Sequence, residues 1–333
     1  MEKLKIDKNL LQWLVERQSP TCSQQSLIFI TELANYLKEK GFDVKTDHAN
    51  NIYAVKKKDE NFSGFYPCFV SHTDTSQNLH KKIELIEKDG FLIGWDGEKQ
   101  VGPGFDDKVG ICISLQLAEQ FDNVKLFFAS DEESGCIGSS QADLSFFNDV
   151  SFCAQPDRRG DSDFIYYTNR TQVVSEEFIN HSLPLLDRYK YNLNEGSFTD
   201  IGCLVNRGIG ICCFNISCGY YNEHTNQERL DLSAAEKCLN FLYDFTKSTS
   251  YKRWVYNPED GMESTNTYIK EKIIDLTVDL LYELEFVNNL PPRVKLLVNQ
   301  LNRLLYEDQY NQSIWSFSAW DDLFNSYNGW NNS

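Results

Sequence analysis

The chain has 333 residues, a formal net charge of −17 at pH 7, and a hydrophobic content of 41%. This length and apolar content suit one large folded core with an appendage, or two domains, and they exclude disorder throughout. So negative a charge balance argues against nucleic acid and against an anionic membrane surface as partners.

The cysteines and the first residues of the chain indicate its compartment. Ten cysteines are scattered along the sequence without a Cys-x-x-Cys pair, which is typical of free thiols in a reducing environment. Residues 1–8 lack the apolar core of a signal peptide, and no apolar run reaches the ~20 residues that span a bilayer. We therefore expect a cytoplasmic protein that does not enter the membrane.

The chain begins with two predicted helices, over residues 7–18 and 24–40. In the second helix apolar residues recur at helical spacing, and Gly41 follows as a C-cap. Short strands are predicted next, at 42–44 and 51–55, on either side of a turn. This alternation of helix and strand continues along the chain and predicts an α/β fold.

The apolar run from Tyr66 to Val70 predicts a buried strand that ends in the polar sequence Ser-His-Thr-Asp-Thr, residues 71–75. Open α/β sheets place their chemistry at the carboxyl ends of strands. His72 and Asp74 are two residues apart, so an extended backbone puts both side chains on one face. A metal-bound imidazole needs a partner on its other nitrogen, and Asp74 suits that role. Alone, a His-x-Asp pair is more often an ordinary hydrogen-bonded loop.

The same pattern recurs at later positions in the chain. Glu132 and Glu133 follow a second apolar run, and Asp157 follows a third. A glycine-rich loop presents Asp106 at the start of a predicted helix, where a simple N-cap is the ordinary explanation. His224 follows a final predicted strand. The repetition of acids and histidines at strand ends indicates one shared site.

Two histidines and several carboxylates form a ligand set that suits zinc, or manganese or cobalt in the same geometry. Two metal ions ~3.5–4 Å apart need a carboxylate that binds both of them. A further carboxylate must stay free to take a proton from water. Because neighbouring side chains diverge, one of Glu132 and Glu133 can bind metal while the other acts as the base.

At this point the sequence resembles the co-catalytic di-zinc exopeptidases, which include peptidase T, the tetrahedral aminopeptidases and the short bacterial aminopeptidases. The similarity covers most of residues 7–245 and is carried by an ordered set of motifs. These motifs are His72-x-Asp74, Gly104-x-Asp106-Asp107-Lys108-x-Gly110, Asp131-Glu132-Glu133-x-Gly135, Asp157 and His224-Thr225. The resemblance implies a three-layer α/β/α fold with a mixed, largely parallel sheet.

The resemblance also implies two divalent metal ions, with zinc as the first choice. It assigns His72 and Asp157 to one ion, and Glu133 and His224 to the other. Asp106 would bridge the two ions, in a loop that in this family usually contains a cis Asp-Asp peptide bond.

Other residues receive supporting roles from the same resemblance. Glu132 would be the general base that acts on a water between the metals, and Asp74 would orient the metal-bound histidine. Thr199 and Asp200 resemble the family's element near the substrate.

Asp157 is the ligand with a clear alternative. The arginines that follow it, Arg158 and Arg159, replace the small residues usual after this ligand. A turn aspartate or an arginine-paired aspartate is the other explanation, and Asp163 is then the substitute ligand. The remaining histidines are predicted to lie on the surface, namely His48, His80 and His181.

The spacing of the motifs predicts the domain organisation. The interval from Asp157 to His224 has little room for a lid or dimerisation domain, or for a lid arginine that reads a substrate carboxylate. We expect one catalytic domain over residues 1–248 and a helical extension over 249–333. The extension ends in an aromatic tail that we expect to dock on the protein's own surface.

The sequence thus predicts a metal-dependent aminopeptidase that acts on short peptides. Glu223 or Asp200 could bind the free α-amino group, and a surface role is the equal alternative for each. An N-acyl amino acid amidohydrolase with the same metal core is the rival enzyme. A non-catalytic binding protein on this fold is the third alternative. The sequence leaves the oligomeric state open.

Overall fold

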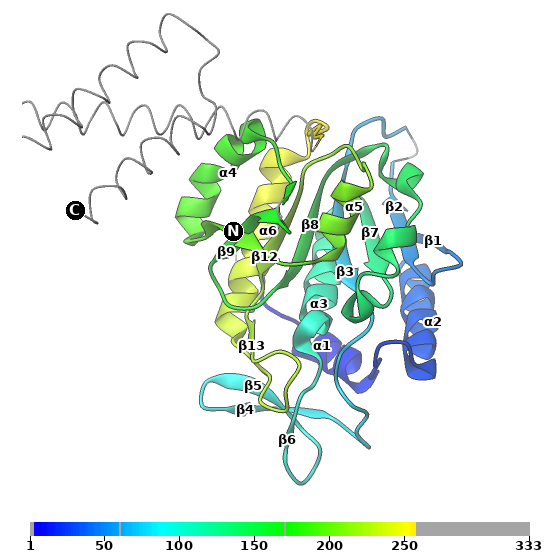
Figure 1. Ribbon diagram of the computed structural model, residues 1–333, viewed down its shortest axis with the longest axis vertical. Coiled ribbons are helices and arrows are strands. Elements are labelled where there is room, and N and C mark those ends of the chain that lie inside the picture. The colour runs from blue at the N-terminus through cyan, green and yellow to red at the C-terminus, as the bar shows by residue number, and fades with distance from the viewer. Residues whose placement is uncertain (1–2, 60, 170, 258–333) are drawn as a thin grey trace, which may run out of the picture. The chain divides into compact units, whose positions relative to one another are not determined.

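The computed structural model describes residues 3–59, 61–169 and 171–257, and Figure 1 shows their arrangement. The predicted helices and aromatic tail beyond residue 257 lie outside the described residues. The start of the predicted extension packs on the core, because Trp254 and Tyr256 are buried there. Among the helices of these ranges, none is long and apolar enough to cross a bilayer.

A mixed nine-stranded sheet forms the centre of the fold. Its strands, in spatial order, are β1 (Asp43–Thr46), β2 (Ile52–Lys57), β7 (Asn123–Ala129), β3 (Tyr66–His72), β8 (Val150–Arg158), β12 (Cys213–Ser217), β9 (Asp163–Thr168) and β10 (Thr171–Gln172), with β11 (Asn192–Gly196) beside β9. The four central strands β7, β3, β8 and β12 run parallel, and antiparallel strands flank them. The carboxyl ends of these central strands therefore meet at one edge of the sheet.

Helices cover both faces of this sheet (Figure 1). They are α1 (Lys8–Glu16), α2 (Gln24–Glu39), α3 (Phe105–Gln120), α4 (Glu176–Tyr189), α5 (Asp200–Asn206) and α6 (Leu232–Thr249). Helix α3 packs on β3 and β8 and contacts α1 and α6, whereas α5 lies over β12 on the other face. The predicted three-layer α/β/α fold with a mixed, largely parallel sheet is confirmed.

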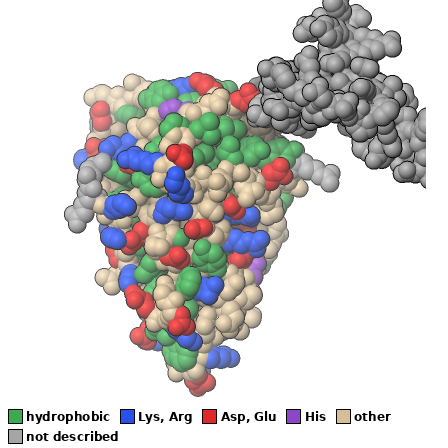
Figure 2. Space-filling view, turned by 90° about the vertical axis from the view of Figure 1, so that its left-hand side faces the viewer, with side chains coloured by type: hydrophobic (Ala, Val, Ile, Leu, Met, Phe, Trp, Pro, Cys, Tyr) green, Lys and Arg blue, Asp and Glu red, His purple; other side chains and the backbone are tan. Residues whose placement is uncertain are grey.

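The core explains why this order of elements is stable. All seven residues of β3 are buried, as expected for a central parallel strand covered on both faces. A cluster of buried phenylalanines joins β8, β9 and β12 to α4 and α6; its members are Phe152, Phe164, Phe178, Phe214, Phe241 and Phe245. On the face seen in Figure 2, acidic and basic side chains are interspersed and apolar side chains gather in the upper part.

A second, smaller sheet joins two distant parts of the chain. Its strands are β4 (Glu84–Lys88), β5 (Phe91–Trp95), β6 (Gln100–Val101), β13 (Tyr220–Tyr221) and β14 (Arg229–Leu230). Arg229 pairs with Ile93, so the loop between β13 and β14 is fastened beside the chain that enters α3. The small sheet thus brings the segment of His224 to the segment of Asp106.

The start of α3 has an unusual backbone. Gly104 caps the helix with a left-handed φ of 76°, and a Cβ at this position would lie 2.7 Å from the Thr75 side chain. The peptide bond between Asp106 and Asp107 is cis. Both acids are buried and both lie in the first turn of α3, next to the end of β3.

Candidate metal centre

His72 is the last residue of β3 and is almost fully buried. Its Nδ1 lies 2.9 Å from the backbone oxygen of Asp74 and 3.5 Å from the Oδ1 of that residue. Its Nε2 lies 3.0 Å from Asp106 Oδ1 and 3.6 Å from Asp157 Oδ1. The ring is therefore fixed through one nitrogen and presents the other to two carboxylates, as metal-binding histidines do.

Asp106 faces two histidines at once. Its Oδ1 is 3.0 Å from Nε2 of His72, and its Oδ2 is 3.1 Å from Nε2 of His224. Burial alone would raise the pKa of Asp106, but the two imidazoles hold that pKa well below its ordinary value. One carboxylate placed between two imidazoles has the geometry of a ligand that bridges two cations.

His224 lies in the loop between β13 and β14, and its side chain is half-exposed. Its Nε2 is 2.8 Å from Glu133 Oε1, and hydrogen bonding first to Asp106 and then to Glu133 raises the pKa of His224 to about 10. Glu133 Oε1 is itself buried, and the His224 imidazole is its contact in the described part of the chain. A buried carboxylate oxygen that faces an imidazole nitrogen fits a metal ligand.

Asp157, near the end of β8, is held at both of its oxygens. The Tyr220 hydroxyl donates to Oδ1 at 3.2 Å, and the Gln155 amide donates to Oδ2 at 3.0 Å. Burial, followed by the nearby charge of Asp106, raises the pKa of Asp157 to about 7. Asp163, the substitute ligand that the sequence offered, instead accepts a hydrogen bond from Arg158 at 3.1 Å and belongs to neither of the ligand groups around His72 in the described residues.

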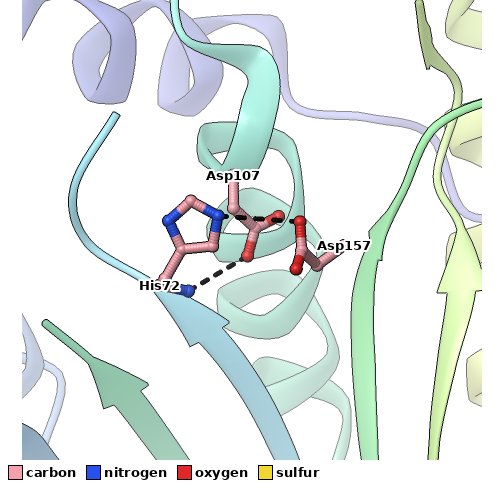
Figure 3. A group of neighbouring side chains, drawn as sticks. All are labelled: His72, Asp107 and Asp157. Atoms are coloured by element: carbon pink, nitrogen blue, oxygen red, sulfur yellow. Dashed lines mark hydrogen bonds and ion pairs between the residues drawn. The ribbon is translucent and has the colours of Figure 1, made fainter. Parts of the chain in front are cut away.

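Figure 3 shows Asp107 close to His72 and Asp157. The carboxylate of Asp107 accepts the backbone N–H of His72 at 3.2 Å and the backbone N–H of Gly110 at 3.0 Å. Both of its oxygens thus bind the main chain. Asp107 therefore ties α3 to β3, while Asp106 faces the imidazole rings.

Glu132 and Glu133 open the short 3₁₀ helix that follows β7. Glu132 lines the same pocket as Asp106 and Asp157. Burial, as the largest cause, and the neighbouring carboxylates together raise the pKa of Glu132 to about 9. A carboxyl group with this raised pKa is suited to exchange protons with a substrate, and bound cations would lower the pKa again.

Thr199 and Asp200 lie on the β11–α5 connection, beside the site. The Thr199 hydroxyl donates to Gln155 Oε1 at 2.8 Å and the residue lines the pocket. Asp200 is fully buried, and its Oδ2 accepts a hydrogen bond from Gln155 Nε2 at 3.2 Å. Asp200 is thus buried beside Gln155 and is not among the residues that line the pocket.

Two residues that the sequence reasoning missed hold the ligands in place. Gln155 is fully buried and its amide joins Asp157 to the Thr199–Asp200 turn. Glu228 is also fully buried and accepts the backbone N–H groups of Gly104 at 2.7 Å and of Asp106 at 3.0 Å. Burial raises the pKa of Glu228 to about 8. Gln155 lies close to Asp157 in the sequence, and Glu228 lies close to His224. This closeness was the available signal for each of them.

The three histidines outside the motifs differ in exposure. His48 is exposed, as predicted. His80 and His181 are partly exposed. The His181 ring lies 4.8 Å from the Trp254 ring. None of the three belongs to the cluster around Asp106 in the described residues.

The residues of the site fit two divalent cations. One group combines His72, Asp157 and one oxygen of Asp106; the other combines His224, Glu133 and the second oxygen of Asp106. Nitrogen and carboxylate ligands of this kind suit zinc and also manganese or cobalt. Several buried carboxylates in one place have few compensating cations among the described side chains, which further favours bound metal.

Comparisons with known proteins find the same fold in solved structures. Neither a family model nor a curated protein matches the sequence of the chain. Aminopeptidase PepT from Bacillus cereus matches with a TM-score of 0.58 at 13% identity, over 73% of this chain and 97% of the other. A tripeptidase from Staphylococcus aureus matches with a TM-score of 0.56 at 16% identity, over 72% and 98%.

A third structure, the TET1 peptidase of Pyrococcus horikoshii, is more distant. It matches with a TM-score of 0.51 at 11% identity, over 72% of this chain and 98% of the other, and its published description is of assembly into a tetrahedron or a large octahedral shell. These likenesses agree with the family that the sequence motifs resemble. The chain therefore has the fold of the co-catalytic zinc exopeptidases.

Proposed function

We propose that the protein is a metal-dependent exopeptidase that removes N-terminal residues from short peptides. The observation that carries this proposal is the position of Asp106 between His72 and His224, with Glu132 at the wall of the same pocket. The peptidase fold and the names of the similar structures, an aminopeptidase and a tripeptidase, support the same choice.

Two divalent ions bound there would polarise the scissile carbonyl and lower the pKa of water, so that it could lose a proton and attack near neutral pH. His72 and Asp157 would hold one ion, His224 and Glu133 would hold the other, and Asp106 would offer one oxygen to each. The His72 ring is held at its other nitrogen by the Asp74 backbone oxygen, which fixes the direction in which Nε2 points.

Glu132 is the group that transfers the proton in this mechanism. It takes a proton from the attacking water and passes it to the leaving amine. Its place beside Glu133 in the short 3₁₀ helix lets one carboxylate bind metal while the other stays in the pocket. The Asp74 carboxylate accepts the backbone N–H groups of both glutamates and so sets their positions.

The pocket favours a small substrate. Its volume is about 190 Å³, which is below the ~300–1,000 Å³ of sites for drug-sized ligands. Phe198 lines it although half of its side chain is exposed to solvent, and it offers an apolar surface for a substrate side chain. The proposed substrate is therefore a peptide of a few residues.

One observation favours the rival activity, an N-acyl amino acid amidohydrolase. Glu223 is the pocket carboxylate nearest in sequence to His224, and it already pairs with Arg159 at 2.8 Å. A neutralised Glu223 gives less attraction to a free α-amino group. An acylated substrate has no charged α-amino group that needs a carboxylate partner.

Hydrolysis of matched short peptides with free and N-acetylated N-termini, followed by mass spectrometry, tests both activities. The proposal expects loss of single N-terminal residues from the free peptides with zinc, and no loss with chelator. Cleavage of the acetyl group alone would replace the aminopeptidase with the amidohydrolase. The absence of turnover with either set, in protein shown to hold two ions, would overturn the proposed activity.

A further inference from the structure

The pocket has a basic wall that the metal centre does not use. Arg158 and Arg159 both line it, immediately after Asp157. Arg159 is mostly exposed and donates to Glu223, while only 23% of the Arg158 side chain is exposed. No ion pair joins either guanidinium to a carboxylate of the candidate metal centre within the described ranges. The pocket is therefore lined by guanidinium groups as well as by the carboxylates of the candidate metal centre.

Arg158 is anchored through one nitrogen. Its Nε donates to Asp163 Oδ2 at 3.1 Å, and the other oxygen of Asp163 accepts the Asn194 amide at 3.0 Å. The backbone N–H of Asp163 donates to Ser217 Oγ at 3.1 Å, and Ser217 is the β12 partner of Arg158 in the sheet. Asp163 is thus a fixed support for the guanidinium group.

The two terminal nitrogens of Arg158 make no hydrogen bond to any residue that the structure describes. A guanidinium has five N–H groups in a planar fork, so the bond from Nε leaves four of them. This fork matches the two oxygens of a carboxylate, and charge-assisted bonds of this kind are among the strongest in proteins. A supported, partly buried guanidinium that lines a pocket is a binding group for an anion.

We propose that Arg158 binds a carboxylate of the substrate, so that the site selects substrates with a negative charge close to the scissile bond. This inference rests on the proposed hydrolase function and specifies its substrate. The carboxylate can be the C-terminal group of a short peptide, or of an acyl amino acid, or it can be an acidic side chain. The small pocket places any of these near the metal centre.

The steric and electrostatic arrangement supports this selection. With ions bound, the scissile amide would face the carboxylates of the metal centre, and Arg158 lines the same pocket next to Asp157. A substrate carboxylate at Arg158 would pair with an arginine whose side chain is mostly buried, where charge pairing is screened less than at the surface. Loss of the Arg158 charge should therefore weaken the binding of substrates that carry this carboxylate more than the binding of uncharged substrates.

The test compares Arg158→Met and Arg158→Lys with the wild type on three matched tripeptides. The first has a free C-terminal carboxylate, the second is its C-terminal amide, and the third is an amide that carries a glutamate after the scissile bond. Arg188→Met is the control, because Arg188 lies on α4, is largely exposed and pairs with Asp244. Zinc content and melting temperature are measured for each variant, and only variants that match the wild type in both are compared.

The wild type should prefer at least one of the two negatively charged peptides to the uncharged amide by about 10- to 100-fold in kcat/KM. Arg158→Met should remove this preference and leave turnover of the uncharged amide within about threefold. Arg158→Lys keeps the positive charge but loses the planar fork, so it should retain part of the preference for charged peptides. Arg188→Met should retain all of this preference. The preferred peptide identifies the source of the carboxylate.

Equal losses on charged and uncharged peptides would overturn the inference, because Arg158 would then only support Asp163. A wild type that does not discriminate would overturn it as well. The same comparison by calorimetric binding to zinc-loaded Glu132→Gln protein does not need turnover. Absence of turnover together with carboxylate-selective binding would reject the proposed reaction and keep the role of Arg158. Binding without that selectivity would reject the role of Arg158.

Discussion

The carboxylate of Asp74 and the backbone of Glu132 are joined by a hydrogen bond, in which the Glu132 N–H donates to Oδ1 at 2.9 Å. The next N–H, of Glu133, donates to Oδ2 of the same carboxylate at 3.2 Å. The backbone oxygen of Asp74 meanwhile lies 2.9 Å from Nδ1 of His72. One aspartate therefore positions a ligand from the end of β3 and both glutamates from the end of β7.

Asp74→Asn should lower zinc affinity and kcat together. An amide has only one oxygen, so one of the two backbone N–H groups would face an NH₂ group instead of an acceptor. Loss of a partner that orients metal ligands lowers affinity or activity by about 10- to 100-fold. Zinc titration and steady-state kinetics measure both effects. The matched control is Asp143→Asn, which changes a helix cap away from the site; an equal loss there would assign the effect to general destabilisation.

Glu132→Gln and Glu133→Gln should separate the base from the ligand. Glu132→Gln removes the proton acceptor and should lower kcat by about 10²–10⁴-fold with zinc content unchanged. Glu133→Gln should lower zinc occupancy first, since Glu133 Oε1 lies beside His224. Metal analysis and kinetics on the same preparations show which of the two glutamates binds metal and which acts as the base. Loss of metal in the Glu132 variant with full metal in the Glu133 variant would exchange the two roles.

Glu228→Gln should weaken metal binding although Glu228 faces backbone groups. Its two oxygens accept the N–H groups of Gly104 and Asp106, and glutamine keeps one acceptor and adds a donor in the wrong place. The loop of Asp106 should then lose its fixed position, and zinc affinity should fall by about 10- to 100-fold. Competition with a zinc chelator measures this change. Unchanged affinity would mean that the cis-peptide loop holds its shape without Glu228.

The metal-free protein should become less stable as the pH rises from 5 to 9. Burial raises the pKa of Glu132 to about 9 and of Glu228 to about 8, and burial and Asp106 raise that of Asp157 to about 7. Hydrogen bonding to Asp106 and Glu133 raises the pKa of His224 to about 10. A group with a raised pKa binds its proton more tightly in the folded state, so its stabilisation is lost as the pH rises towards that pKa.

Each proton that the folded state holds in excess corresponds to ~1.4 kcal/mol of unfolding free energy per pH unit. Zinc must displace these protons, so added zinc should raise the melting temperature more at pH 8 than at pH 5. Thermal unfolding with and without zinc across this range measures both trends. Glu132→Gln should give a shallower fall for the metal-free protein. A melting temperature that rises with pH in the metal-free wild type would contradict the account.

Local patterns in the sequence predicted the fold and most of the candidate ligands. His72, Glu132 and Asp157 each follow or end an apolar run, so their place at one edge of a parallel sheet follows from strand direction. The approach of His224 to Asp106 depends on the pairing of β14 with β5, which joins residues far apart in the chain. The order of the motifs predicted that His224 and Asp106 lie close together only through the resemblance to the di-zinc exopeptidases.

Other parts of the site could not be predicted, because their partners are set by tertiary structure. The sequence suggested that the Asp74 side chain meets the neighbouring imidazole. In the structure the Asp74 backbone oxygen is nearer to that ring, and its carboxylate binds N–H groups of a different strand end. Gln155 and Glu228 belong to no pattern of alternation or helical spacing. Their roles depend on which backbone and carboxylate groups the fold brings next to them.

Zinc titration of the metal-free protein, with bound ions and hydrolysis of a tripeptide measured in parallel, tests the central claim most directly. We predict that two ions bind at saturation and that turnover appears as the second ion binds. Asp106→Asn should lower the occupancy of both ions, because both histidines lie against its carboxylate. Hydrolysis that persists without metal, or full activity with one ion bound, would contradict a two-metal peptidase centre built around Asp106.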